Sequence, residues 1–154
     1  MSVQIVLGSK SDMKVAEKAI AVLRELGIKY KLSIASAHRT PELVDKLVAE
    51  ADAEVFIAIA GLSAALPGVI AARTIKPVIG VPVSGTLNLD AILSVVQMPP
   101  GVPVAGVGLD RGENAALLAA AILALKDGKI RKALSNYRQK LKDQVAQDSK
   151  DVET

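Results

Sequence analysis

The chain of 154 residues contains no cysteine, no tryptophan and one histidine, and aromatic side chains make up only 2% of it. Without cysteine it forms no disulfide and no thiolate metal site, a composition that fits a cytoplasmic protein. Hydrophobic residues nonetheless make up 51% of the chain, so the core must be built from Ala, Val, Ile and Leu. Small aliphatic side chains favour close packing of helices on a sheet, and this length predicts one domain.

Long apolar runs are also missing, because Gly, Pro or a charged residue interrupts each one before it reaches the ~18 residues of a membrane span. We therefore expect no membrane partner and no secretory leader. The net charge is +3, but residues 1–125 carry 11 basic and 11 acidic side chains, so the basic excess lies in residues 126–154. With so few aromatic residues to stack on bases, this distribution disfavours nucleic acid as a partner.

Short apolar runs alternate with helical patterns along the chain. Residues 55–60 are apolar throughout and stop at Gly61, which is typical of a strand buried on both faces. Strands are predicted at 3–7, 30–35, 55–60, 77–83 and 102–107. Helices are predicted from a cap at Ser11 or Asp12 to Gly27, from Pro41 onward, at 63–74 and 89–96, at 114–125 as a buried helix that is apolar almost all round, and from 129 onward.

This alternation predicts a parallel, doubly wound sheet with helices on both faces, a three-layer α/β/α domain with a flavodoxin-like strand order. Residues 1–126 form the main body, and residues 127–154 form a C-terminal helix and tail of the same domain. That helix is amphipathic, with one apolar stripe consisting of Ile130, Leu134, Tyr137, Leu141 and Val145. The stripe packs either on its own domain or on a neighbouring subunit.

Polar residues gather where the first three strands end. The loops contain Ser9, Ser11 and Asp12 after the first strand, Ser36, His38 and Arg39 after the second, and Gly61 and Ser63 after the third. The carboxyl ends of parallel strands meet at one edge of the sheet, where ligands bind. Histidine exchanges protons near neutral pH, so His38 is the candidate acid or base. The plainer alternatives are a loop histidine without a role and a Ser/Asp helix cap.

Several motifs resemble one enzyme family of purine biosynthesis. They are Gly-Ser-x-Ser-Asp from residue 8, Ser-Ala-His-Arg-Thr-Pro from residue 36, Leu-Pro-Gly-Val from residue 66, Pro-Val-Ile-Gly-Val-Pro-Val from residue 77, Val-Val-Gln-Met-Pro from residue 95 and Asn-Ala-Ala-Leu-Leu-Ala-Ala from residue 114. In this order they resemble the N5-carboxyaminoimidazole ribonucleotide mutases and aminoimidazole ribonucleotide carboxylases.

The resemblance implies a ribonucleotide substrate, a homo-octamer and no metal or organic cofactor. It implies that His38 handles a proton and that Ser9, Asp12 and Arg39 bind substrate. The remaining predicted substrate-binding residues are Ser11, Ser36, Gly61, Ser63 and Leu66.

One position departs from the family pattern. Class I members, the mutases, have a histidine where this chain has Ala65. Class II members, which carboxylate aminoimidazole ribonucleotide with CO2, lack it and carry Arg-Ser-Asn, whose serine aligns with Ser63. Here Leu62 and Ala64 replace the arginine and asparagine. We favour the mutase on overall similarity.

Three alternatives stay open beside the mutase. The first is direct carboxylation of aminoimidazole ribonucleotide, and the second is a non-catalytic nucleotide-binding or scaffold protein. The third is a related nucleotide carboxylase that makes a nickel-pincer cofactor, which would need a cysteine nucleophile that this chain lacks.

Overall fold

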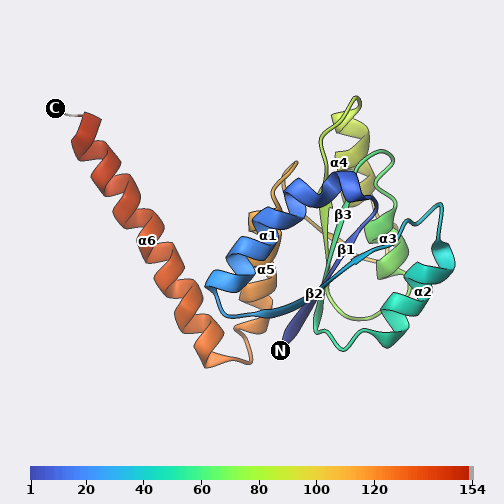
Figure 1. Ribbon diagram of the computed structural model, residues 1–154, viewed down its shortest axis with the longest axis horizontal. Helices are drawn as coiled ribbons and strands as arrows, with labels where there is room; N and C mark the ends of the chain where they lie inside the picture. The colour runs from blue at the N-terminus through green and yellow to red at the C-terminus, as the bar shows by residue number, and fades with distance from the viewer. Residues whose placement is uncertain (153–154) are drawn as a thin grey trace.

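The computed structural model describes residues 1–152, in which parallel strands form one sheet in the order β2-β1-β3-β4-β5 (Figure 1). The strands are β1 (Ser2–Leu7), β2 (Lys29–Ile34), β3 (Val55–Ala60), β4 (Val78–Pro82) and β5 (Ala105–Gly106). In register, Val3 of β1 lies beside Tyr30 of β2 and Val55 of β3. This strand order is the predicted flavodoxin-like one.

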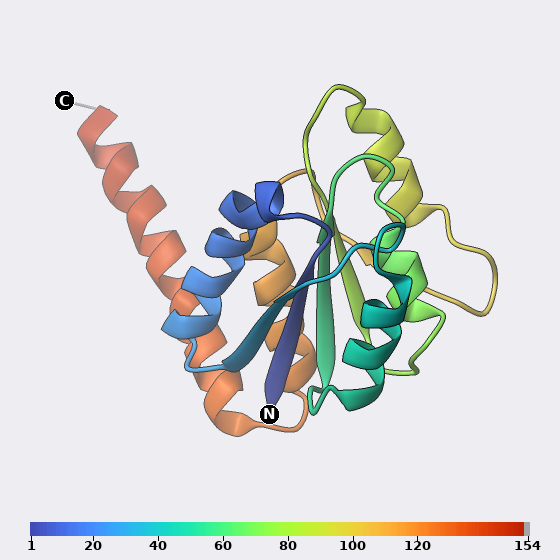
Figure 2. The same ribbon diagram turned by 45° about the vertical axis from the view of Figure 1, so that its right-hand side comes forward.

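Helices cover both faces of the sheet, which confirms the three-layer α/β/α prediction. They are the short 3-10 helix η1 (Lys10–Asp12) and the α-helices α1 (Met13–Glu25), α2 (Pro41–Glu50), α3 (Leu66–Ala71), α4 (Asn88–Val96), α5 (Gly112–Leu123) and α6 (Gly128–Val152). In Figure 2, α1 and α5 lie on one face of the sheet and α2, α3 and α4 on the other.

Strand β3 lies at the centre of the sheet and is fully buried, as its unbroken apolar run predicts. Its residues alternate between two cores. Ile57 and Ile59 pack in the core beneath α1 and α5, while Phe56 and Ala58 pack in the core beneath α2, α3 and α4. A residue period of 2 on a strand covered on both faces therefore explains why every position is apolar.

Strand β4 carries a glycine where two helices approach the sheet closely. A Cβ at Gly80 would lie 2.6 Å from a methyl group of Val95 in α4 and 3.1 Å from Pro67 in α3. Any larger side chain would push α3 and α4 away from the sheet. Helix α3 contributes to one wall of the cavity described below. Gly80 therefore determines how closely that wall approaches the sheet.

Three predicted elements differ from the structure. The fifth strand was predicted at 102–107 but contains only Ala105–Gly106; Pro103 lacks the N–H that a longer ladder would need. Helix α3 begins at Leu66 rather than at residue 63, with Pro67 in its first turn, where proline is tolerated. Helix α5 is buried along one stripe rather than almost all round, and Leu125 beyond its end is exposed.

The long C-terminal helix α6 packs on the domain only through its first half. Ile130 is buried, and Leu134 and Tyr137 pack against the core beneath α1 and α5. Leu141 and Val145 continue the same stripe but are exposed. Figure 1 shows the second half of α6 directed away from the sheet. Within residues 1–152 no helix combines the length and apolar character that crossing a bilayer requires.

Candidate active site

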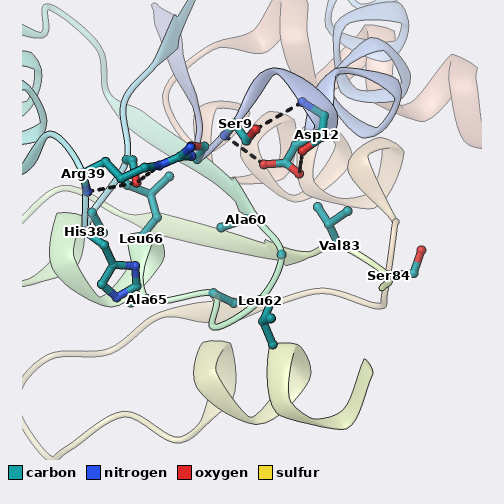
Figure 3. Close-up of a pocket in the computed structure, with 16 residues that line it drawn as sticks. Ser9, Asp12, His38, Arg39, Ala60, Leu62, Ala65, Leu66, Val83 and Ser84 are labelled. Carbon is teal, nitrogen blue, oxygen red and sulfur yellow. Dashed lines mark hydrogen bonds between the residues drawn. The ribbon is translucent and has the colours of Figure 1, made fainter. Parts of the chain in front are cut away.

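A cavity of about 560 Å³ opens where β1, β2, β3 and β4 end. Its size suits a small nucleotide. It is lined by Gly8, Ser9, Ser11, Asp12, Ser36, Ala37, His38, Arg39, Ala60, Gly61, Leu62, Ala64, Ala65, Leu66, Val83 and Ser84. The polar residues that the sequence places after separate strands therefore meet at one edge of the sheet, as parallel topology requires (Figure 3).

The loop after β1 is closed by a capping box between Ser9 and Asp12 (Figure 3). The backbone N–H of Ser9 donates to Oδ2 of Asp12 at 3.0 Å, and the Ser11 N–H donates to Oγ of Ser9 at 3.4 Å. Asp12 occupies the N-cap position of α1, as predicted, but the side chain that caps the preceding 3-10 turn is that of Ser9. Asp12 precedes α1 but makes no side-chain cap to it. Ser9 and Asp12 therefore cap this turn and also line the cavity.

The carboxyl group of Asp12 is almost fully buried at the cavity wall. Burial raises its pKa above the ordinary value of 3.8, because a charged carboxylate loses solvation there. Hydrogen bonds from the Ser11 hydroxyl and the Ser9 N–H, and the charge of Arg39, lower the pKa but do not cancel the effect of burial. A diol or another neutral donor arriving at Asp12 would add the hydrogen bonds that favour its ionised form.

The loop after β2 is held by its own side chains. The Ser36 N–H donates to Oγ1 of Thr40 at 2.9 Å, and the Thr40 N–H donates to the Ser36 carbonyl at 3.0 Å. Oγ of Ser36 accepts both the backbone N–H and Nε of Arg39. This closed turn leads directly into α2, with Pro41 in its first turn. The loop therefore presents His38 and Arg39 on a fixed backbone.

The guanidinium of Arg39 crosses from the second loop to the first, where Nη2 donates to the Gly8 carbonyl at 3.1 Å. Among residues 1–152, no carboxylate lies within 4.0 Å of this guanidinium. Its hydrogen-bond acceptors are neutral oxygens of Gly8 and Ser36, so its positive charge stays available to an anion. Arginine binds carboxylate and phosphate groups through two parallel N–H donors.

His38 is exposed and lies at one end of the cavity, the end that also holds Ala65, while Val83 and Ser84 lie at the other end (Figure 3). Within the described part of the chain its imidazole makes no hydrogen bond. Both ring nitrogens therefore remain available to a bound molecule. Ala65, the N-cap residue of α3, and Leu66, its first residue, contribute apolar side chains to the cavity lining.

The predicted site residues lie together with one exception. Ser9, Ser11, Asp12, Ser36, His38, Arg39, Gly61 and Leu66 line the cavity, whereas Ser63 is exposed and does not. Sequence reasoning missed Val83 and Ser84, although they directly follow β4 and the same strand-end rule could have found them. Within residues 1–152, no group of three or more His, Cys, Asp or Glu side chains is placed to hold a metal ion.

Comparison with known proteins agrees with this geometry. The AIR carboxylase family matches residues 2–144 of the chain. The N5-carboxyaminoimidazole ribonucleotide mutase of Methanocaldococcus jannaschii is 61% identical over 142 residues, which are 92% of this chain and 90% of that protein. A probable mutase of Methanobrevibacter smithii is 56% identical over 90% of this chain, which spans 43% of that longer protein.

Solved structures give the same result. The crystal structure of Treponema denticola PurE superposes on this chain with a TM-score of 0.90 at 34% identity, covering 99% of this chain and 98% of that one. The family match extends over most of the chain, and the Methanocaldococcus relative is similar over nearly its whole length. By sequence and by fold, the chain belongs to the AIR carboxylase family.

Proposed function

We propose that this protein is an N5-carboxyaminoimidazole ribonucleotide mutase, an isomerase that forms 4-carboxyaminoimidazole ribonucleotide in purine biosynthesis, and that it acts in the cytoplasm. The observation that carries the proposal is the cavity itself, which brings His38, Arg39 and Asp12 from two strand ends into one space. A relative that is 61% identical over most of both chains bears the name of this mutase. The scaffold alternative leaves the free imidazole and guanidinium in this cavity unexplained.

The polar residues suit the separate parts of such a substrate. Arg39, whose guanidinium forms no ion pair with a carboxylate of residues 1–152, suits the carboxylate or the phosphate of the ribonucleotide. Asp12 suits the two hydroxyl groups of the ribose, which would donate to its oxygens. Ser9 and Ser36 line the same cavity and supply hydroxyl donors for the phosphate, whereas the hydroxyl of Ser11 already donates to Asp12.

His38 suits the two proton transfers of the isomerisation. When the carbamate bond between N5 and the carboxyl carbon breaks, N5 gains a proton and CO2 is released within the cavity. Carbon C4 then attacks the CO2, and the tetrahedral C4 loses its proton. An imidazolium that donates to N5 and an imidazole that accepts from C4 return His38 to its starting state. The enclosing side chains of Ala65 and Leu66 hold the CO2 near C4 until it is captured.

Ala65 favours direct carboxylation as the second candidate function. A methyl group neither donates nor accepts a proton, so a second imidazole is absent from the end of the cavity where His38 lies. If the mutase needs that imidazole to keep CO2 in place, this protein would instead take CO2 from solution.

Isotope labelling separates the two reactions. The substrate is N5-carboxyaminoimidazole ribonucleotide labelled with ¹³C in its carbamate, in excess unlabelled bicarbonate. We expect the product to retain the label, and we expect Ala65→His to raise the retention modestly. Complete loss of the label, together with turnover of aminoimidazole ribonucleotide and bicarbonate, would assign the protein to the direct carboxylases. Tight binding of either nucleotide without turnover would leave only the scaffold.

We also propose that the protein forms a homo-octamer. Leu89, Leu93 and Val96 form an exposed apolar stripe at helical spacing on α4, and Leu141 and Val145 form another on α6. Apolar patches of this kind on a small domain mark contact surfaces. The protruding half of α6 gives a second copy of the chain a long helix to pack against.

A further inference from the structure

A carboxylate outside the predicted site holds one wall of the cavity. The backbone N–H of Ser84, which lines the cavity, donates to Oδ1 of Asp110 at 2.8 Å. Asp110 lies in the turn before α5, 26 residues further along the chain, and does not line the cavity itself. The bond therefore ties the cavity wall to a separate element.

Asp110 joins three parts of the molecule at once. Its N–H donates to the carbonyl of Pro82 at the end of β4, at 2.9 Å. Its carbonyl accepts Nζ of Lys18 from α1 at 3.0 Å. Its side chain accepts the Ser84 N–H. Asp110 therefore joins the end of β4, the Ser84 wall of the cavity and α1, the helix that follows Asp12.

The backbone of Asp110 is left-handed, with φ at 59°. Side chains other than glycine rarely adopt this conformation, and Asp and Asn adopt it more readily than most. The conformation places the N–H, the carbonyl and the carboxylate on their three partners. Glycine would satisfy the backbone equally well, but it would supply no carboxylate. The residue type therefore matters for the bond to Ser84.

The bond between Ser84 and Asp110 lies where the chain leaves β4 and enters the loop that leads to α4. Val83 is still anchored, because its N–H donates to the carbonyl of Ala60 at the end of β3. Residues 84–87 are exposed and lead into α4, and the N–H of Gly85 donates to Oδ1 of Asn88, the first residue of that helix. The carboxylate of Asp110 thus anchors this loop to the body of the domain at its first residue.

We propose that Asp110 is a positioning residue that holds the Val83–Ser84 wall of the cavity in the conformation that binds the ribonucleotide. This role rests on the proposed function. It requires an acceptor oxygen on the side chain of residue 110, because the backbone N–H of Ser84 is the donor. It therefore predicts that asparagine at position 110 works and that alanine and glycine do not.

Hydrogen exchange tests the contact without any substrate. Exchange at the Ser84 amide, followed by mass spectrometry on overlapping peptides, should be about tenfold faster in Asp110→Ala and Asp110→Gly than in the wild type. Asp110→Asn should retain most of the protection. Lys18→Met is the matched control, since it removes a bond to the Asp110 backbone and the attraction of the Lys18 charge, while the acceptor oxygen for Ser84 stays in place; its exchange at Ser84 should match the wild type.

Kinetics tests the role. In Asp110→Ala and Asp110→Gly we expect KM for N5-carboxyaminoimidazole ribonucleotide to rise about tenfold with kcat within threefold, and Asp110→Asn to restore KM. If Asp110→Gly restores KM as well, the left-handed backbone is the whole requirement and the positioning role is overturned. Unchanged KM in all three variants overturns it too.

The two proposals fail separately. A wild-type protein that turns over neither nucleotide refutes the proposed function, but the exchange rates still show whether Asp110 holds Ser84. In that case the affinities of the same variants for 4-carboxyaminoimidazole ribonucleotide, measured by calorimetry, replace KM. Equal affinities would overturn the positioning role, and a tenfold loss that only asparagine repairs would support it.

Discussion

Single residues at the cavity divide the work between binding and proton transfer. Arg39 and Asp12 carry charge that is fixed by neighbouring bonds, whereas the imidazole of His38 is not engaged by any of residues 1–152. A side chain held by bonds suits the binding of a ligand, and a side chain with free nitrogens suits proton exchange. Substitutions at these residues therefore test substrate binding and proton transfer separately.

Replacing His38 tests proton transfer. His38→Asn keeps a polar side chain of similar size but cannot accept a proton at neutral pH, so we expect turnover to fall by ~10²-fold or more while product binding stays within a few fold. Stopped-flow or coupled assays give turnover, and calorimetry gives binding. Turnover near that of the wild type would show that His38 is only a loop residue.

Replacing Asp12 tests the buried carboxyl group through pH. Its folded pKa is raised above 3.8, so the folded protein holds this proton at pH values where the unfolded chain has lost it. The proton therefore stabilises the fold below 3.8, and this contribution is lost as pH rises through the folded pKa. Asp12→Asn removes that dependence.

The measurement is urea unfolding of both proteins from neutral pH to pH 4. We expect the free energy of unfolding of the wild type to improve relative to Asp12→Asn as pH falls. The opposite trend would mean that the bonds from Ser9 and Ser11 outweigh burial. Asp12→Ala should weaken nucleotide binding more than it lowers stability; a variant that unfolds while its folded fraction still binds would leave Asp12 only as a cap.

At the scale of elements, two glycines set how closely the helices approach. Gly80 lets α3 and α4 pack on β4, and Gly112 lets α5 begin against the backbone of α1. A Cβ at Gly112 would overlap the carbonyl oxygen of Val15 in α1. Because that oxygen belongs to a helix backbone, it cannot move aside as a flexible side chain would.

Gly112→Ala should therefore destabilise the fold by about 1–3 kcal/mol, the range for overpacked positions. Gly128→Ala is the matched control, since a Cβ there meets nothing within 4 Å and alanine is the better helix former. Urea denaturation compares the two. Equal stability of both variants would show that α1 and α5 separate at low cost.

At the scale of the whole molecule, two stripes of exposed apolar side chains, on α4 and on the outer half of α6, lie outside the cavity. We expect light scattering at micromolar concentration to give the mass of eight chains of 16.0 kDa. A mass near 16.0 kDa would refute the assembly.

A substitution on α4 sharpens this test. Leu89 is 68% exposed, so Leu89→Glu should cost the isolated chain little but should dissociate an assembly that buries it. Asn136→Glu adds the same charge at an exposed position of α6, on the side of the helix away from its apolar stripe, and serves as the control. An unchanged mass for Leu89→Glu would remove α4 from the interface.

The sequence by itself determined the alternation of strands and helices and the edge where the polar loops meet. These follow from local patterns: an unbroken apolar run makes β3 a central strand, and the strand-end position of Ser9, His38 and Arg39 places them at one edge of any parallel sheet. The family and the mutase function were predicted from the resemblance of the motifs. The spacing of apolar and polar residues alone predicts neither of them.

Only the tertiary structure decided which residues complete the cavity and how they are held. Ser63 turns away while Ser84 lines the wall, although both follow strand ends. Ser9 rather than Ser11 or Asp12 supplies the capping side chain, and Asp110 reaches Ser84 across 26 residues of sequence. Such contacts depend on distances between loops that are far apart along the chain. Local periodicity carries no information about those distances, because the packing of α1, α3 and α5 on the sheet sets them.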